Sequence, residues 1–241
     1  MLKHGLIAIS FLGLLLALPA RADEAQESPF NFHIGGGFGV SVNPTANFAG
    51  LGGAFQVGGG PNLTKHQSIV GEFMWQGLPP TRNALLPVAN ALCLLNSPVV
   101  NPLTASVPCS VASINATDNL YALTANYMYR IEGERFGYYV IGGGGWYYRS
   151  AQLKIPTLAP GTVCAPSWDW WGYSCVNGLI STDTTLASRA VSSGGVNVGV
   201  GLTLRVTQSG LKFYMEARYH YSPQGGRIST QIVPVTFGFR W

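Results

Sequence analysis

The chain has few charged residues for its length. Only 10% of its 241 residues are Asp, Glu, Lys or Arg, whereas soluble domains carry roughly 25%. Its 14 basic and 10 acidic residues give a formal charge of +4, which falls to +2 without Lys3 and Arg21 of the expected leader. So weak a charge gives no sign of a nucleic-acid-binding surface. We expect much of the outer face to contact something other than water.

Long apolar runs are also absent from most of the chain. Beyond Ala22 there is no run of eighteen apolar residues, so a transmembrane helix is not expected. Before that point, a short basic start precedes an apolar run over residues 6–18, and a small-x-small cleavage site ends at Ala22. This pattern predicts a secretory signal peptide over residues 1–22, followed by a polar periplasmic lead-in over residues 23–29.

The chain lacks the motifs of common metal and nucleotide sites. No CxxC pair and no neighbouring histidine accompany the cysteines, so a zinc site is not expected. The glycines at 35–37 are followed by Val40 where G-x-G-x-x-G requires its third glycine, which excludes a dinucleotide site. We therefore expect neither a metal nor a cofactor.

Four cysteines, Cys93, Cys109, Cys164 and Cys175, lie in the two longest stretches with little strand character. An even number in an exported chain predicts two disulfides, and the sequence permits three pairings. We favour Cys93–Cys109 and Cys164–Cys175, because each of these pairs brackets one loop. Closing such a loop removes about 3 kcal/mol of unfolded-state chain entropy.

What the chain does contain is alternation of large apolar residues with small or polar ones. This period of two indicates strands with one apolar and one polar face. Most stretches are about ten residues or slightly longer, the length that a tilted barrel strand needs to cross a membrane. Eight stretches show the pattern, near residues 30–42, 48–59, 66–76, 119–131, 137–149, 190–206, 211–221 and 230–241.

Short and long connections alternate between these stretches. The tight ones lie at residues 60–65, 132–135 and 207–210, whereas 77–118 and 150–189 are very long. Outer-membrane barrels have short periplasmic turns and longer extracellular loops, so both long segments are expected as surface loops. The sequence predicts an all-β, eight-stranded antiparallel up-and-down transmembrane β-barrel over residues 30–241.

The last hairpin carries the most specific pattern. Residues 216–221 read EARYHY and residues 233–241 read VPVTFGFRW, and this hairpin resembles that of small OmpA-like outer-membrane barrels. The resemblance implies a location in the bacterial outer membrane, contact with its lipids and lipopolysaccharide, and recognition by the barrel assembly machinery. The assembly signal it implies comprises Phe237, Phe239 and Trp241. OmpA itself carries a peptidoglycan-binding domain after its barrel, for which this chain has no room, so cell-wall anchoring is not expected.

If the aromatic faces contact lipid, the polar faces point into the lumen. An eight-stranded barrel has an interior just wide enough for side chains to fill, and an unpaired buried charge is very costly. We therefore expect a lumen ion-pair network of Glu72, Arg205, Glu216 and Arg218.

The strongest catalytic hint is His220 followed by Ser222. Their spacing places both side chains on one strand face, where the imidazole could activate the hydroxyl, and the pair resembles that of outer-membrane lipid A deacylases. Glu216 is the last acidic residue, so the downstream carboxylate of that pattern is missing. A structural role for His220 is favoured, and we do not expect an enzyme.

Aromatic residues cluster between the last two cysteines. Trp168, Trp170, Trp171 and Tyr173 are candidates for recognition, because aromatic rings stack on sugars and anchor protein partners. Packing at the outer rim of the barrel is the favoured alternative. A surface ligand of the loop over 150–189 is thus one expected partner.

We expect a structural or surface-interaction role in the outer membrane, with a narrow pore as a variant of it. Two other classes remain open. One is a lipid A-modifying hydrolase that uses His220 and Ser222. The other is a soluble ligand-binding barrel with reversed faces, which the low charge disfavours.

Overall fold

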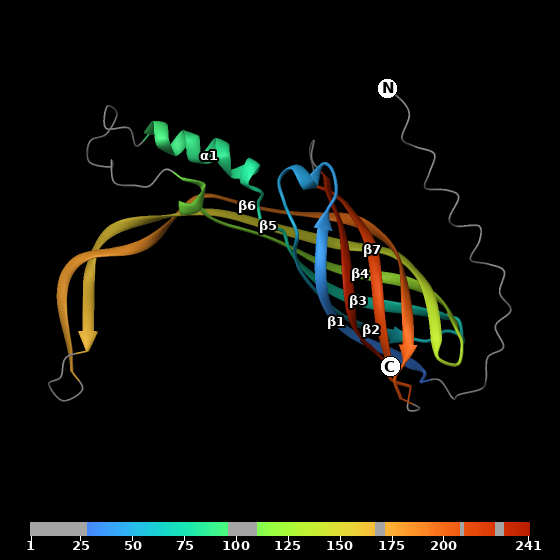
Figure 1. Ribbon diagram of the computed structural model, residues 1–241. Helices are drawn as coiled ribbons and strands as arrows, with labels where there is room; N and C mark the ends of the chain where they lie inside the picture. The colour runs from blue at the N-terminus through green and yellow to red at the C-terminus, as the bar shows by residue number, and fades with distance from the viewer. Residues whose placement is uncertain (1–27, 96–109, 167–171, 208–209, 225–228) are drawn as a thin grey trace, which may run out of the picture.

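The computed structural model describes residues 28–95, 110–166, 172–207, 210–224 and 229–241. The expected signal peptide over 1–22 lies outside these residues, as does most of the lead-in. The strands are β1 (Phe30–Ser41), β2 (Gly52–Pro61), β3 (Gln67–Gly77), β4 (Asn115–Glu132), β5 (Phe136–Pro166), β6 (Tyr173–Arg205), β7 (Lys212–Pro223) and β8 (Ser229–Arg240). Each pairs antiparallel with the next, and β1 pairs with β8, so the eight strands form a closed barrel (Figure 1). The predicted fold class is confirmed.

Glycines make the closing seam between β1 and β8 possible. The register runs from His33 opposite Arg240 to Ser41 opposite Ile232. A Cβ atom on Gly37 would lie 2.0 Å from the carbonyl oxygen of Val235, closer than a side chain tolerates. Glycine there lets the first and last strands approach without a clash, and closure leaves the barrel wall without a free edge.

The outer face of the barrel is apolar. Large hydrophobic side chains point outward from strands all around the wall, and these include Ile34 on β1, Phe73 on β3, Leu123 on β4 and Val200 on β6. Leu123 is 65% exposed and Val200 is 54% exposed. We call this ring of exposed apolar side chains the apolar belt. A water-soluble protein rarely exposes a contiguous apolar surface of this kind.

The lumen shows the opposite polarity. Its buried side chains include many polar and charged ones, among them His33, Gln56, Glu72, Asn126, Glu216, Arg218 and Arg240. Period-two alternation explains both faces, since successive side chains of a strand point to opposite sides of the wall. The barrel is thus apolar outside and polar inside.

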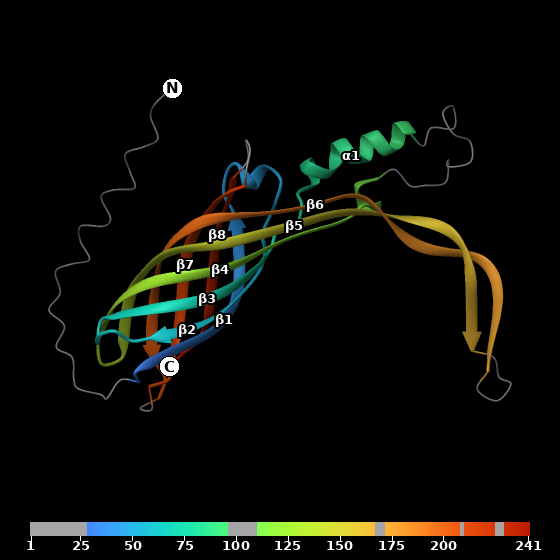
Figure 2. The same cartoon turned by 180° about the vertical axis from the view of Figure 1, so that it is seen from behind.

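The prediction of a loop over residues 150–189 is wrong. β5 and β6 pair out to Pro166 opposite Tyr173, with one register shift between Leu153 and Lys154, so strand occupies most of this segment. β4 accompanies β5 only as far as Lys154, and β7 accompanies β6 only as far as Val196. Beyond the wall, residues 155–166 and 173–184 form a two-stranded hairpin, which we call the arm. Figures 1 and 2 show it leaving one end of the barrel and curving away.

The reason for this error is that both faces of the arm meet solvent. Alternation of apolar and polar residues appears only where one face is buried, and residues 174–177 and 179–190 are all exposed. Serine and threonine are frequent there, and Val176 and Ile180 add further β-branched residues. β-Branched residues favour strands without producing an amphipathic stripe.

The predicted loop over residues 77–118 is only partly irregular. It contains helix α1 (Arg82–Leu95), the short 3-10 helix η2 (Val111–Ser113) and the first residues of β4. Leu85 and Ala89 of α1 pack with Ile155 at the base of the arm. Apolar residues three or four positions apart form this contact. A second 3-10 helix, η1 (Thr45–Asn47), lies between β1 and β2.

No helix in the described parts of the chain combines the length and the apolar character required to cross a membrane.

The apolar belt leads to a first prediction. Val200→Arg places a charge at the middle of the outward stripe on β6, and it should destabilise the barrel folded in lipid by about 2–4 kcal/mol. Val176→Arg is the matched control, because Val176 lies on the same strand and is 65% exposed but belongs to the arm. Urea titration of both variants in vesicles measures the difference. Equal stabilities would mean that the belt does not contact lipid.

Candidate functional site in the barrel lumen

The centre of the lumen contains two carboxylates and one guanidinium group. Glu72 projects inward from β3, and Glu216 and Arg218 project inward from β7 two residues apart, as the period of a strand requires. Each of the three is at most 2% exposed. Their charges are therefore removed from water, and they must find partners within the lumen.

Arg218 bridges the two carboxylates. Its Nη1 donates to Oε1 of Glu72 at 2.6 Å and its Nη2 donates to Oε2 at 3.0 Å, a bidentate pair. The same Nη2 lies 2.5 Å from Oε1 of Glu216. Bidentate contacts between guanidinium and carboxylate groups are among the strongest hydrogen bonds in proteins. The contact with Glu72 joins β3 to β7 across the lumen.

Neutral side chains complete this network. Nε2 of His33 on β1 lies 3.0 Å from Oε2 of Glu72. The hydroxyl of Tyr139 on β5 donates to Oε2 of Glu216 at 2.8 Å. Nε2 of Gln56 on β2 donates to Oε1 of Glu216 at 3.3 Å and to the hydroxyl of Tyr214 at 3.1 Å. Five strands thus contribute to a single cluster, which we call the lumen network.

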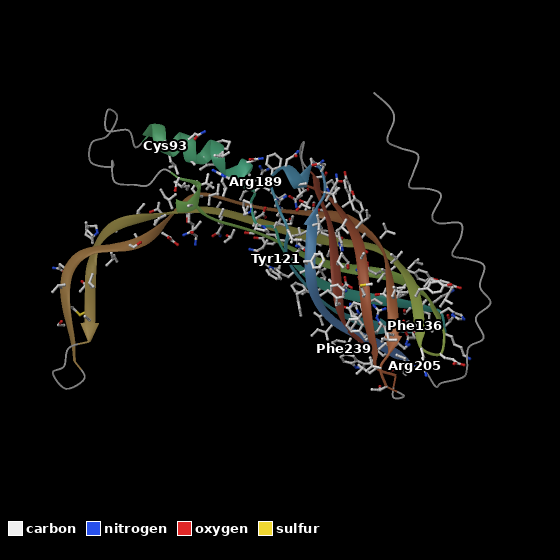
Figure 3. All side chains as sticks on the ribbon, in the orientation of Figure 1. Cys93, Tyr121, Phe136, Arg189, Arg205 and Phe239 are labelled. Carbon is white, nitrogen blue, oxygen red and sulfur yellow. A yellow bond between two sulfur atoms is a disulfide. The ribbon has the colours of Figure 1, made fainter. Side chains whose placement is uncertain are left out.

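Arg205 does not belong to the lumen network, although we predicted it there. It is exposed at the last position of β6, and Figure 3 shows it at the end of the barrel opposite the arm. Thr203, two residues before it on the same face of β6, is buried. The predicted face of Arg205 is therefore right, but its predicted position along the barrel axis is wrong. Alternation identifies the side of the wall that a residue faces, but it does not say where the wall ends.

His33 is the member of the network that we missed. It alternates with Asn31 and Gly35 on the inward face of β1, and all three are buried. The same parity that selected Glu72 would have selected His33. A histidine next to glycines carries no charge pattern, however, so it did not stand out.

Two smaller ion pairs lie at other levels of the barrel. Arg149 on β5 donates from Nε to Oδ1 of Asp118 at 3.0 Å, and its Nη1 donates to Thr230 at 3.0 Å. Toward the end that contains the C-terminus, Lys212 pairs with Glu132. These pairs place charged partners at several levels of a lumen that also contains two apolar clusters, one with Met74 and Leu120 and one with Val70 and Met128.

His220 and Ser222 do not form a catalytic pair. Both are buried, at 2% and 1% exposure, and both face the lumen. Nδ1 of His220 lies 2.9 Å from the hydroxyl of Tyr147, while Oγ of Ser222 lies 2.7 Å from Oγ of Ser193. Neither group can reach a lipid substrate outside the wall. Within the described ranges, His, Cys, Asp and Glu form no cluster of three that could hold a metal.

The three described cysteines, Cys93, Cys164 and Cys175, lie in segments outside the barrel wall. The disulfide Cys164–Cys175 is present and joins the two strands of the arm. Cys93, on α1, is also disulfide-bonded, but its expected partner Cys109 lies outside the described residues. The same is true of Trp168, Trp170 and Trp171, whereas Tyr173 begins β6.

The aromatic residues of the last strand point outward. Phe237, Phe239 and Trp241 are 37%, 46% and 48% exposed, and Figure 3 shows Phe239 on the barrel wall. The ring of Trp241 lies 4.9 Å from that of Phe32 on β1. These aromatic side chains extend the apolar belt to the seam.

Comparison with solved structures finds small barrel proteins of bacteria. Ail, the attachment invasion locus protein of Yersinia pestis, is 14% identical, with 89% of this chain and 100% of that one covered and a TM-score of 0.42. Neisserial surface protein A is 12% identical, with coverages of 88% and 96% and a TM-score of 0.48. The N-terminal barrel domain of Pseudomonas aeruginosa OprF is 12% identical, with coverages of 90% and 100% and a TM-score of 0.39.

A scan against models of protein families finds no match, and a search of curated proteins finds none either. Identities of 12–14% are too low to transfer a function from these barrels to this chain.

The lumen network leads to a second prediction. Arg218→Met leaves two buried carboxylates without their cation, and it should destabilise the barrel by about 3–5 kcal/mol. Arg205→Met is the matched control and should change stability by no more than about 0.5 kcal/mol, since Arg205 is exposed. The midpoint and slope of urea unfolding in detergent micelles measure both variants. A small effect of Arg218→Met would mean that the network does not stabilise the wall.

Proposed function

We propose that this protein is an outer-membrane β-barrel that acts as a scaffold for a surface-exposed arm. The observation that carries the proposal is the reversed polarity of the barrel, with an apolar belt outside and a charged network inside. In a membrane, lipid covers the belt, and antiparallel closure satisfies the backbone hydrogen bonds that lipid cannot. Short turns at one end and long segments at the other match the orientation of outer-membrane barrels.

A scaffold is favoured over an open pore because of what fills the lumen. Arg218, Glu72 and Glu216 meet near its centre and are almost fully buried. An eight-stranded barrel is only wide enough for its own side chains. A continuous column of water would have to break the bidentate contact between Arg218 and Glu72. A narrow conducting pore is therefore the less supported variant.

The two other classes have less support. A lipid A hydrolase would need His220 and Ser222 to face lipid, but both are buried among lumen side chains. A soluble ligand-carrying barrel would need an apolar interior and a charged exterior, which is the reverse of the arrangement here. The proposed role is therefore non-enzymatic.

The arm and α1 are the proposed surface for partners. In Figures 1 and 2 they extend from the same end of the barrel, opposite the end that contains the C-terminus. Val176 and Leu179 of the arm are 65% and 63% exposed. The tryptophans between Cys164 and Cys175 in the sequence remain candidates for stacking on a sugar or anchoring a protein.

The proposed partners of the wall are the lipids and lipopolysaccharide of the outer membrane. The outward aromatic side chains Phe237, Phe239 and Trp241 support a role in recognition by the barrel assembly machinery. Nothing in the charge pattern supports binding to nucleic acid.

Fractionation combined with gel mobility tests the membrane location. The full chain, expressed in a Gram-negative host, should fractionate with the outer membrane and migrate faster before boiling than after it. Compact barrels that resist detergent show this difference, whereas most soluble proteins do not. Recovery in the soluble periplasmic fraction, with mobility unchanged by boiling, would contradict the proposal.

The filled lumen predicts electrical silence. Purified protein inserted into a planar bilayer should give no conductance steps of the size that water-filled pores produce, because charged side chains occupy the path. A water-filled porin reconstituted in parallel is the positive control. Regular steps from the wild-type protein would favour the pore.

The disulfide of the arm predicts a local effect. In the variant Cys164→Ser with Cys175→Ser, the heat-dependent mobility shift of the barrel should be unchanged, because the arm lies beyond the wall. Cleavage of the arm by an added protease should become several times faster, since the loss of the crosslink lets the hairpin open. Limited proteolysis in vesicles measures this rate. Loss of the mobility shift would mean that the arm and the barrel fold as one unit.

A further inference from the structure

Arg240 occupies an unusual position in the lumen. It is the last residue of β8, and its backbone lies opposite His33 of β1 and Lys212 of β7. Its side chain is only 4% exposed. Unlike Arg149 and Arg218, it forms no salt bridge with any residue that the structure describes.

Aromatic rings lie against the guanidinium group of Arg240. Its Cζ atom lies 4.4 Å from the ring centroid of Tyr139 and 5.2 Å from that of Tyr214. Nη1 contacts the sulfur of Met128 at 3.1 Å. Rings and a thioether provide cation–π attraction but only weak hydrogen-bond acceptors. The N–H groups in the guanidinium plane therefore still require partners.

Two of these nitrogens, Nε and Nη2, have no hydrogen-bond partner among the described residues, although both are buried. Nε and Nη2 lie on one edge of the guanidinium group, and that edge presents two parallel N–H donors. A carboxylate or a phosphate group fits such an edge with two oxygens. The unused donors therefore have the geometry of an oxyanion-binding fork.

The balance of charges in the lumen also favours an anion near Arg240. The nearby carboxylates are already engaged, since Glu72 and Glu216 contact Arg218, and Glu132 contacts Lys212. If His33 is left out of the count, these groups comprise five cationic side chains and four carboxylates, which leaves one positive charge in excess. The members of this count are Arg130, Arg149, Lys212, Arg218 and Arg240 against Glu72, Asp118, Glu132 and Glu216.

We propose that Arg240 is a binding site for one small oxyanion, a carboxylate or a phosphate group, inside the lumen. The oxyanion accepts hydrogen bonds from Nε and Nη2 and balances the excess charge. The Tyr139 and Tyr214 rings cover the guanidinium and lower the local dielectric constant, which strengthens the contact. Their hydroxyls are engaged by Glu216 and Gln56, so the fork alone recognises the ligand.

Lys212 places a second cation at the level of the site. It begins β7 opposite Arg240, at the end of the barrel away from the arm, and its ammonium group is bound to Glu132. Lys212 lies at the same level as Arg240, and Arg130 contacts the same carboxylate as Lys212. Cationic side chains along a narrow path raise the local concentration of anions.

The test measures the heat-induced mobility transition of the purified full chain in detergent micelles. Sodium formate, sodium phosphate and sodium chloride are compared at equal ionic strength. A ligand that binds only the folded state raises the transition temperature, here by roughly 3–5 °C in the effective oxyanion relative to chloride. A response to formate assigns a carboxylate, and a response to phosphate alone assigns a phosphate group.

Variants identify the fork as the cause. Arg240→Met should abolish the difference between oxyanions and chloride, and Arg240→Lys should keep the charge but lose the oxyanion preference. Arg205→Met is the control and should respond like the wild type. If Arg240→Met does not fold, the lysine variant and the wild-type salt series still decide. Equal transition temperatures of the wild type in all three salts, or an unchanged oxyanion preference in Arg240→Lys, would overturn the proposal.

Discussion

The contact between Arg218 and Glu72 is the interaction on which the rest of the barrel depends. It spans the lumen from β7 to β3 with two short hydrogen bonds. The other members of the network contact one of these two residues or Glu216. Because the pair is desolvated, each partner is costly without the other. This coupling allows charged groups to be buried in the interior of a small barrel, beside the apolar lumen clusters around Met74 and Val70.

The same constraint separates the molecule into two regions with different chemistry. Within the wall, every inward side chain must fit a narrow lumen that contains both polar and apolar groups, and every outward side chain must suit lipid. The arm and α1 lie beyond the wall, so their side chains need not fit either the lumen or lipid. Their apolar contacts, such as Leu85 and Ala89 with Ile155, form a small separate cluster, and a disulfide links the strands of the arm. The surface region can therefore change its residues without disturbing the lumen.

Alternation allowed the wall to be predicted closely, because one face of each strand is buried and the other is not. It failed in three places for physical reasons. Arg205 has the right parity but is the last residue of β6, where its side chain is exposed rather than enclosed by the lumen. The arm has solvent on both faces, so its strands carry no amphipathic stripe. Helix α1 contains Pro87. Because proline is disfavoured inside a helix, the sequence pattern did not indicate a helix there. His33 followed the rule and was overlooked.

A register shift in β6 changes which residues of this strand share a face in the wall and in the arm. The pairing of β5 with β6 shifts by one residue between Leu153 and Lys154, which leaves Leu186 as an extra residue in β6. In the wall, odd-numbered residues of β6 face the lumen; in the arm, even-numbered residues such as Thr184 lie on the side of Ile155. Leu186 thus shifts the alternation by one residue, so that residues on the lumen side change from odd to even numbers along β6. Without Leu186, the pairs Leu153–Ala187 and Lys154–Thr185 would follow each other in regular alternation, so the arm and the barrel would both keep their present faces.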